Sequence, residues 1–458
     1  MKLRAFLAFL ALAVTSVVAN DRPNIVFIFT DDHCTQALSA YDATRMATPN
    51  MDRIAKDGMR FDRAYVTNGI CGPSRAVIQT GKYSHINGFM TNGQTFNADQ
   101  QTFPKLLQKA GYQTAVVGKW HLKATPQGYD YYDVLIGQGP YYNPPMKTAG
   151  EDGEPITVKH TGYTTDIITE KSLDWLKNKR ADDKPFMLMY QHKAPHRNWQ
   201  PGPKYLTWLD DQEIPEPETL WDDYSNRASP AAEQTMTIER HLNPNDLKLT
   251  EPRGFTDEQL KAWNAAYGPK NKAFEEAKLE GKELVKWKYQ RYVKDYLRCV
   301  KSVDDGIGEI MDYLEEAGLA ENTIVVLSSD NGGAGYVSLP EVNAPFRGWK
   351  ITLFEGGIRV PMFIKWPERI APGTVVDTPV AHIDLLPTLA DAAGADLPTD
   401  RIIDGRNILV EATGTGTIER PNDAIFWQSG DYRVVRAGDW KLQVDGNQNT
   451  NWLFDLAA

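Results

Sequence analysis

The sequence predicts a doubly wound α/β fold, in which helices cover both faces of a mostly parallel sheet. Short apolar runs bounded by polar residues are typical of buried parallel strands, and they occur at 24–29, 114–117, 186–190, 324–327 and 360–364. Helical patterns separate these runs at 51–57, 103–110, 166–177 and 289–316. Strands that alternate with helices in this way favour an α/β sheet.

Four of the apolar runs end in a polar cluster. The clusters are Asp31-Asp32, Lys119–His121, His192–His196 and Asp330-Asn331. Open α/β sheets bind their ligands in the crevice beyond the carboxyl ends of the strands. Four clusters in register with four strand ends therefore predict an enzyme with its site at that edge.

The composition is that of an ordinary globular protein. Of 458 residues, 41% are hydrophobic and 24% are charged, which excludes a coiled coil, a collagen-like rod, a disordered chain and a polytopic membrane protein. Lys and Arg number 50 against 60 Asp and Glu, a net charge of −10. An acidic chain of this kind is not expected to bind nucleic acid, and an anionic substrate would need cations gathered locally.

Three segments flank or interrupt the predicted sheet. Residues 1–19 have the basic start, apolar centre and small-residue end of a signal peptide. Their apolar run is too short to span a bilayer. We therefore expect a periplasmic or secreted protein without stable membrane insertion. The charged stretch 200–288 is expected to be a surface insertion with helical pieces at 257–267 and 271–279. Alternating runs at 424–428, 433–436 and 440–444 predict a small antiparallel sheet, which divides the chain into a catalytic domain, 20–415, and a C-terminal subdomain, 416–458.

The strongest local motif begins at Cys71. Residues 71–81, CGPSRAVIQTG, resemble the signature C-x-P-S-R-x-x-x-x-T-G of the type I sulfatases, in which the cysteine is oxidised to Cα-formylglycine. The blocks at 48–66, 118–122, 328–332 and 346–367 are also similar to that family, so the resemblance extends from about residue 24 to residue 440. The chain has two further cysteines, Cys34 and Cys299, and the sequence leaves open whether they form a disulfide.

The resemblance implies an alkaline-phosphatase-like mixed sheet, a small C-terminal antiparallel sheet and hydrolysis of sulfate esters. It also implies a maturation enzyme that generates the formylglycine, and a bound Ca²⁺ rather than Mg²⁺. The residues that it assigns to the metal are Asp31, Asp32, Asp330 and Asn331, with the modified Cys71 facing the same ion. It assigns Arg75 to the active-site turn, Lys119 and Lys350 to the sulfate oxygens, His121 to the second hydroxyl of the aldehyde hydrate and His196 to the leaving oxygen as general acid.

The residue types support this chemistry independently, although each has a simpler alternative. Carboxylate and amide oxygens at separate strand ends suit Ca²⁺, whereas a lone Asp-Asp pair would more often cap a helix. An aldehyde hydrate offers one hydroxyl to attack sulfur and a second whose deprotonation expels sulfate, whereas an unmodified Cys71 would be a small buried residue. Cations around one anion stabilise its transition state, although a single Lys or Arg is usually a surface residue.

The substrate is expected to be a sulfated saccharide. A Tyr-rich segment, 128–145, and the side chains of Arg197 and Trp199 suit sugar rings, although such segments also serve as packing. His192 could contact substrate or be structural, and His33 could lie behind the metal ligands or face the substrate. The segments at 128–145, 196–201 and 287–305 resemble bacterial mucin-desulfating and N-acetylglucosamine-6-sulfatases, whereas 332–349 resembles arylsulfatases.

Two other functions remain open from the sequence. A phosphonate or phosphate monoester hydrolase of the same superfamily would need a similar cage around a tetrahedral anion. A glycan-binding pseudoenzyme would keep Cys71 as a thiol, although binding alone would not require the full set of acids, cations and histidines.

Overall fold

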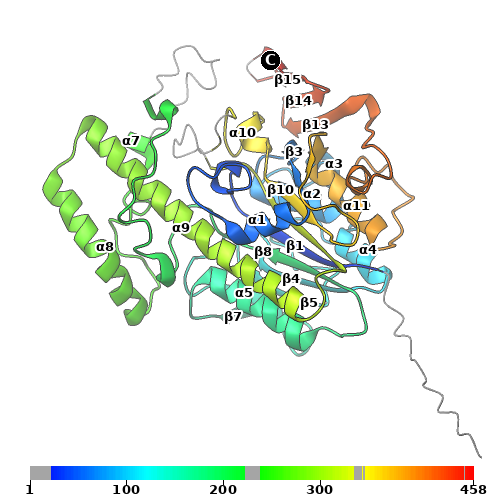
Figure 1. The fold of residues 1–458 in the computed structure, drawn as a ribbon, viewed down its shortest axis with the longest axis horizontal. Helices are drawn as coiled ribbons and strands as arrows, with labels where there is room; N and C mark the ends of the chain where they lie inside the picture. Colours follow the sequence, from blue (N-terminus) through cyan, green and yellow to red (C-terminus); the bar gives the residue numbers. More distant parts are fainter. Residues whose placement is uncertain (1–21, 222–237, 335–342, 344–345, 448, 458) are drawn as a thin grey trace, which may run out of the picture.

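The computed structural model describes residues 22–221, 238–334, 343, 346–447 and 449–457 (Figure 1). The expected signal peptide and most of the arylsulfatase-like segment after Ala334 lie outside these residues. In the described part, ten strands form one sheet in the order β11-β2-β10-β9-β1-β8-β4-β5-β6-β7. Their bounds are β1 Asn24–Thr30, β2 Met59–Phe61, β4 Gln113–Lys119, β5 Tyr131–Leu135, β6 Pro145–Ala149, β7 Pro155–Lys159, β8 Phe186–Gln191, β9 Thr323–Ser329, β10 Met362–Lys365 and β11 Thr374–Val376.

The centre of the sheet confirms the predicted parallel core. β1 pairs in parallel with both β8 and β9, and β4 pairs in parallel with β8 and β5. Strands covered on both faces must be apolar throughout, which explains the continuous hydrophobic runs. β10 differs from the prediction because it runs antiparallel to β9, with Phe363 opposite Leu327. A parallel neighbour needs a covering crossover, and the described chain between these strands has one helix, the four-residue α10, Glu355–Ile358.

Alternation along β1 separates the two hydrophobic cores. Val26 and Ile28 belong to the core beneath α1 (Pro49–Lys56), α5 (Thr164–Asp174) and α9 (Gly281–Glu316). Ile25 and Phe27 belong to the opposite core, covered by α2 (Cys71–Thr80), α4 (Phe103–Lys109) and α11 (Leu385–Ala392). Successive side chains of a strand point to opposite faces, so one buried strand feeds both layers. Figure 1 shows the long helix α9 crossing one face of the sheet.

The insertion is more regular than the sequence predicted. The two expected pieces join into one helix, α8, Asp257–Ala277, which begins with a capping box between Thr256 and Gln259 and continues across Pro269. α9 begins at Gly281, eight residues before the predicted start at 289. The sequence did not predict this first part because residues 281–288 are exposed or half-buried and lack the apolar pattern of a buried helix face.

The predicted C-terminal sheet is present and has a fourth strand. Its order is β13 (Ala424–Ser429), β14 (Tyr432–Ala437), β15 (Trp440–Asp445) and β16 (Thr450–Asp455), all antiparallel. Ile425, Trp427 and Val434 pack into a third buried cluster with the main domain, and Trp427 Nε1 donates to the Val66 carbonyl at 2.6 Å.

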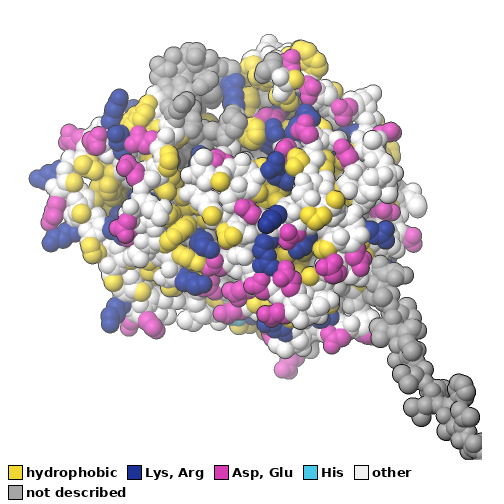
Figure 2. All heavy atoms as spheres, viewed as in Figure 1, with side chains coloured by type: hydrophobic (Ala, Val, Ile, Leu, Met, Phe, Trp, Pro, Cys, Tyr) yellow, Lys and Arg dark blue, Asp and Glu magenta, His cyan; other side chains and the backbone are white. Residues whose placement is uncertain are grey.

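The surface seen in Figure 2 mixes acidic and basic side chains and shows no continuous basic face. Within the described ranges, no helix combines the length and the apolar character that a bilayer span requires.

Candidate active site

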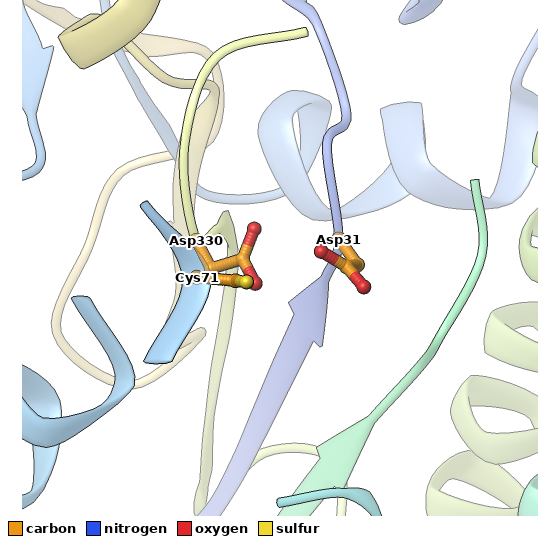
Figure 3. Close-up of side chains that lie close together, drawn as sticks. All are labelled: Asp31, Cys71 and Asp330. Atoms are coloured by element: carbon orange, nitrogen blue, oxygen red, sulfur yellow. The ribbon is translucent and has the colours of Figure 1, made fainter. Parts of the chain in front are cut away.

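The four parallel strand ends bring the predicted clusters together at one edge of the sheet. Asp31 follows β1 and Asp330 follows β9, the neighbouring strand. One ligand atom each from Asp31, Cys71 and Asp330 lies within 4.8 Å of the other two (Figure 3). Asp31, Asp32 and His196 form a second group within the same limit. The structure therefore brings these side chains together at the carboxyl ends of the strands, where the sequence predicts the site.

Cys71 is the first residue of α2. Ile70 before it is extended, and the helix ends at Gly81 in the left-handed conformation, where a Cβ would come within 2.7 Å of Leu386. The side chain of Cys71 is fully buried, and its Sγ lies 3.3 Å from His121 Nδ1 and 3.4 Å from Asn92 Nδ2. The thiol therefore sits inside the site and not on the surface. All three cysteines are free thiols, so Cys34 and Cys299 do not form a disulfide.

Arg75, one turn along α2, ties the strand ends together. Its Nε and Nη2 donate to Asp330 Oδ2 at 3.0 and 2.8 Å. Its Nη1 donates to the Lys119 carbonyl at 2.6 Å and to Gln191 Oε1 at 2.8 Å. The guanidinium is buried, so these charge-assisted bonds are protected from water and fix the orientation of α2 over β4, β8 and β9.

Two buried lysines face the remaining carboxylates. Lys119 Nζ donates to Asp31 Oδ2, and Lys350 Nζ donates to Asp32 Oδ1 at 2.6 Å. Burial alone would raise the pKa of Asp31, but the positive charges of Lys119, Lys350 and Arg75 hold that pKa well below its ordinary value. Burial and the negative charge of Asp31 raise the pKa of Asp330 well above its ordinary value. The carboxylates are thus crowded enough to repel one another.

Two oxygen atoms of this cluster have unused acceptor capacity. Asp31 Oδ1 and Asn331 Oδ1 are buried and have no hydrogen-bond partner among the described residues. The amide of Asn331 is oriented by its own Nδ2, which donates to Asp32 Oδ1 at 2.7 Å. Buried acceptors are costly without a partner, and a hard divalent cation is a partner that carboxylate and amide oxygens can share. The residues present therefore fit a Ca²⁺ ion.

The two catalytic histidine candidates are neutral in this arrangement. Burial, reinforced by the charge of Lys119, lowers the pKa of His121 to about 3. Burial also lowers the pKa of His196 well below its ordinary value. His196 Nδ1 lies 2.6 Å from the Arg197 carbonyl, which can only accept, so Nδ1 carries the proton. His196 Nε2 lies 3.7 Å from Asp32 Oδ2.

Four other predicted residues make their described contacts with residues outside the thiol and carboxylate cluster. Trp199 is only 1% exposed, with its ring 4.3 Å from that of Tyr292, so it offers no free face to a sugar. Arg197 donates to both carboxylate oxygens of Asp246 at 2.8 and 2.5 Å.

The remaining two predicted residues, His192 and His33, are both fully buried. Burial lowers the pKa of His192 to about 3, and its ring lies 4.3 Å from that of Tyr190. The pKa of His33 is lowered by burial to about 4, and its backbone N–H donates to Ser329 Oγ at 3.0 Å. The burial of Trp199 favours a packing role, whereas both ring nitrogens of His192 are buried without a hydrogen-bond partner among the described residues.

Several polar residues of the site were missed from the sequence. They are Asn92, Gln138 and Gln191, which contact Cys71 or Arg75. Gln138 Nε2 lies 4.0 Å from Cys71 Sγ and stands between two glycines of positive φ, Gly137 and Gly139. A Gly-Gln-Gly turn after a strand was the available signal for Gln138. Asn92 lies in a loop without a distinguishing pattern.

A buried thiol with acids and cations at the carboxyl edge of an α/β sheet defines an enzyme site for an anionic substrate. The family model described as Sulfatase matches residues 23–395, and the chain belongs to this family. It is therefore an enzyme, a sulfuric ester hydrolase.

Known relatives agree with this assignment. The chain is 46% identical, over 95% of its length and 81% of the relative's, to N-acetylglucosamine-6-O-sulfatase of Bacteroides thetaiotaomicron. It is 27% identical to human arylsulfatase H, over 85% of this chain and 72% of that protein. A solved structure of a protein in complex with its substrate D-glucosamine-2-N,6-O-disulfate superposes with a TM-score of 0.85 at 40% identity, covering 95% of this chain and 91% of that one. Both resemblances seen in the sequence are thus confirmed at family level.

Proposed function

We propose that this sulfatase hydrolyses the 6-O-sulfate of an amino sugar in a saccharide, using Cys71 after its conversion to formylglycine. The observation that carries the proposal is the position of the Cys71 sulfur, 3.3 Å from His121 Nδ1 and grouped with Asp31 and Asp330. The choice of sugar is supported by the relative at 46% identity, which is an N-acetylglucosamine-6-O-sulfatase.

We propose that Asp31, Asp32, Asp330 and Asn331 hold Ca²⁺, beside the modified Cys71. The support is the pair of unpartnered buried oxygens and the crowding of three carboxylates. When bound, the ion would supply positive charge to the sulfate oxygens and to the attacking hydroxyl. Ca²⁺ is favoured over Mg²⁺ because Mg²⁺ usually keeps several of its waters, and these side chains are buried.

The modified Cys71 would supply a hydroxyl that attacks sulfur and a second hydroxyl through which sulfate is released. Arg75 would hold that residue in place, because its four hydrogen bonds anchor α2 to the neighbouring strand ends. His121 would accept the proton of the second hydroxyl, since its Nδ1 already contacts the side chain at position 71 and burial keeps the ring neutral. Lys119 and Lys350 would stabilise the negative charge on the sulfate oxygens.

His196 would protonate the leaving oxygen as the sulfur–oxygen bond of the ester breaks. The Arg197 carbonyl orients the ring through Nδ1 and leaves Nε2 as the position for the transferred proton. The ring must first gain that proton, and the negative charge of an approaching sulfate ester favours this. The sugar then leaves as a neutral alcohol.

The location, maturation and domain boundaries complete the proposal. Residues 1–19 would direct the enzyme to the periplasm or outside the cell and would then be removed. An oxidising maturation enzyme would modify Cys71. Residues 20–415 would form the catalytic domain and 416–458 the C-terminal subdomain. Neither nucleic acid nor stable membrane insertion is expected for this acidic chain.

A panel of saccharides, each sulfated at one position, tests the proposal. The enzyme would be produced together with a formylglycine-generating enzyme, and sulfate release would be measured for every compound. We expect turnover of 6-O-sulfated N-acetylglucosamine well above that of 2-O-, 3-O- and N-sulfated compounds. Matched nitrophenyl sulfate and phosphate serve as the chemical control. Preference for the phosphate, or for a sulfate at another position, would contradict the proposal.

A further inference from the structure

The site contains one cation more than its carboxylates can pair. Three cations each have a carboxylate partner: Arg75 pairs with Asp330, Lys119 with Asp31, and Lys350 with Asp32. The fourth cation is Lys193, which is only 5% exposed. Its ammonium has neither an ion pair nor a hydrogen bond to any residue that the structure describes. Its one described contact is the ring of Tyr141, with Nζ 4.8 Å from the centroid.

Lys193 is held in place from two sides. It begins the turn that leads to His196, whose backbone N–H donates to the Lys193 carbonyl at 3.1 Å. The ring under its ammonium is fixed as well, because the Tyr141 hydroxyl donates to the His196 carbonyl at 2.5 Å. Tyr141 therefore links the lysine and the candidate general acid, and an aromatic face suits a cation that lacks a counter-ion.

Lys193 lies next to the strand end that carries Asp31, because the backbone N–H of Asp31 donates to the carbonyl of Ala194, the residue after Lys193, at 3.3 Å. Burial lowers the pKa of Lys193 to about 8. The positive charge of Lys119 also lowers this pKa, whereas the negative charges of Asp31 and Asp32 raise it. At neutral pH most of the ammonium is still charged. A buried charge without a counter-ion is unfavourable. A divalent cation bound to the carboxylates would add more positive charge and would give Lys193 no counter-ion. An anion entering the site would relieve this imbalance.

We propose that Lys193 is a further substrate-binding residue, whose ammonium contacts the sulfate group of the bound ester. The inference depends on the sulfatase activity of the family and not on the saccharide proposed above. Sulfate itself, the product of any sulfatase, should then bind to the resting enzyme through Lys193. Because no turnover is involved, the choice of sugar can be wrong while this inference holds.

Titration of the calcium-loaded protein with sodium sulfate tests the proposal directly. Binding is read from the rise in thermal transition at pH 7, with sodium chloride holding ionic strength constant. We expect Lys193→Met to weaken sulfate binding about tenfold or more, because the loss of one charge-assisted hydrogen bond has an effect of this size. Without sulfate, Lys193→Met should melt at the same temperature as wild type or higher, because the substitution removes an unpaired buried charge. Lys193→Arg keeps the charge and should retain most of the binding.

Lys179→Met is the matched control. The Lys179 ammonium lies 4.7 Å from the ring of Tyr131, nearly the same geometry, but this side chain is exposed and pairs with Asp174. Its loss should leave sulfate binding unchanged. Lys193→Gln replaces the Met variant if that protein does not fold. Undiminished sulfate binding by Lys193→Met or Lys193→Gln, at whatever melting temperature, would overturn the inference. A wild-type protein that does not bind sulfate would overturn it as well.

Discussion

The sulfur of Cys71 lies 3.3 Å from Nδ1 of His121, although the two residues are fifty positions apart in the chain. Cys71 opens α2, and His121 follows β4 with a φ of 56°, a left-handed conformation that turns its ring back toward the helix. Both side chains are therefore set by backbone geometry. A proton acceptor thus stands beside the proposed nucleophile before any substrate binds.

Replacing Cys71 by Ala should abolish sulfate release. The substitution removes the only side chain that can become formylglycine at this position, and it deletes one small buried atom. The free energy of unfolding should therefore fall by about 1 kcal/mol or less. Sulfate release and a denaturant titration measure the two effects, and retained turnover would contradict the assigned nucleophile.

Replacing Arg75 by Lys should destabilise the fold as well as the site. Lysine cannot reproduce the two bonds to Asp330 Oδ2 while also reaching the Lys119 carbonyl and Gln191. We expect a loss of about 2–4 kcal/mol in the free energy of unfolding, because buried acceptors are left unpaired.

Arg63→Lys provides the control for this prediction. Arg63 pairs with Asp377, whose side chain is 69% exposed. Exposed pairs contribute little, so we expect a change below about 1 kcal/mol. Equal losses in the two variants would show that the buried network of Arg75 is not the source of its effect.

Replacing His196 by Ala should harm poor leaving groups most. A sugar alkoxide needs a proton as it departs, whereas nitrophenolate leaves readily without one. We expect kcat/KM to fall about 100-fold or more for a sulfated saccharide and less than about tenfold for nitrophenyl sulfate. Steady-state kinetics on both substrates give the ratio, and equal losses would remove His196 from the role of general acid.

Removing calcium should lower both activity and thermal stability. An ion that binds the folded state alone stabilises that state, and here it would also relieve the repulsion between Asp31 and Asp330. The measurement is a melting curve and an assay before and after chelation, with Ca²⁺ added back. Indifference to the chelator would contradict the metal assignment.

Acid should weaken the fold through its buried histidines. Burial lowers the pKa of both His192 and His382 to about 3, whereas the unfolded chain takes up these protons near pH 6.5. Their contribution is fully present above pH 6.5 and is lost as pH falls toward 3, by up to about 1.4 kcal/mol per pH unit for each histidine. Urea unfolding of wild type and His382→Gln at several pH values should show a shallower slope for the variant. Equal slopes would contradict the prediction.

The parallel core and the polar cluster at its strand ends could be predicted because both leave strong local signals. Strands covered on both faces are apolar without interruption, and the polar residues that follow them stand out, as Asp31 after β1 and Asp330 after β9 do. The strand β10 looked the same in sequence but runs antiparallel, since an apolar run does not encode the direction of its neighbour. Edge strands such as β6 and β7 are partly exposed and carry no comparable signal.

The sequence did not predict the side-chain contacts of Arg197 and Trp199. Arg197 and Trp199 lie one and three positions after His196, yet the side chain of Arg197 contacts Asp246 in the insertion and that of Trp199 contacts Tyr292 in α9. Contacts of that kind depend on how distant segments pack, which composition does not reveal. No pattern in the sequence marks Lys193, since a single lysine is usually an exposed surface residue.

Mass spectrometry of the peptide that contains residue 71 tests the central claim most directly. Protein produced together with a formylglycine-generating enzyme should yield a Cys71 peptide about 18 Da lighter than the unmodified one, and sulfatase activity should rise with the modified fraction. An unmodified thiol in fully active protein would contradict the account.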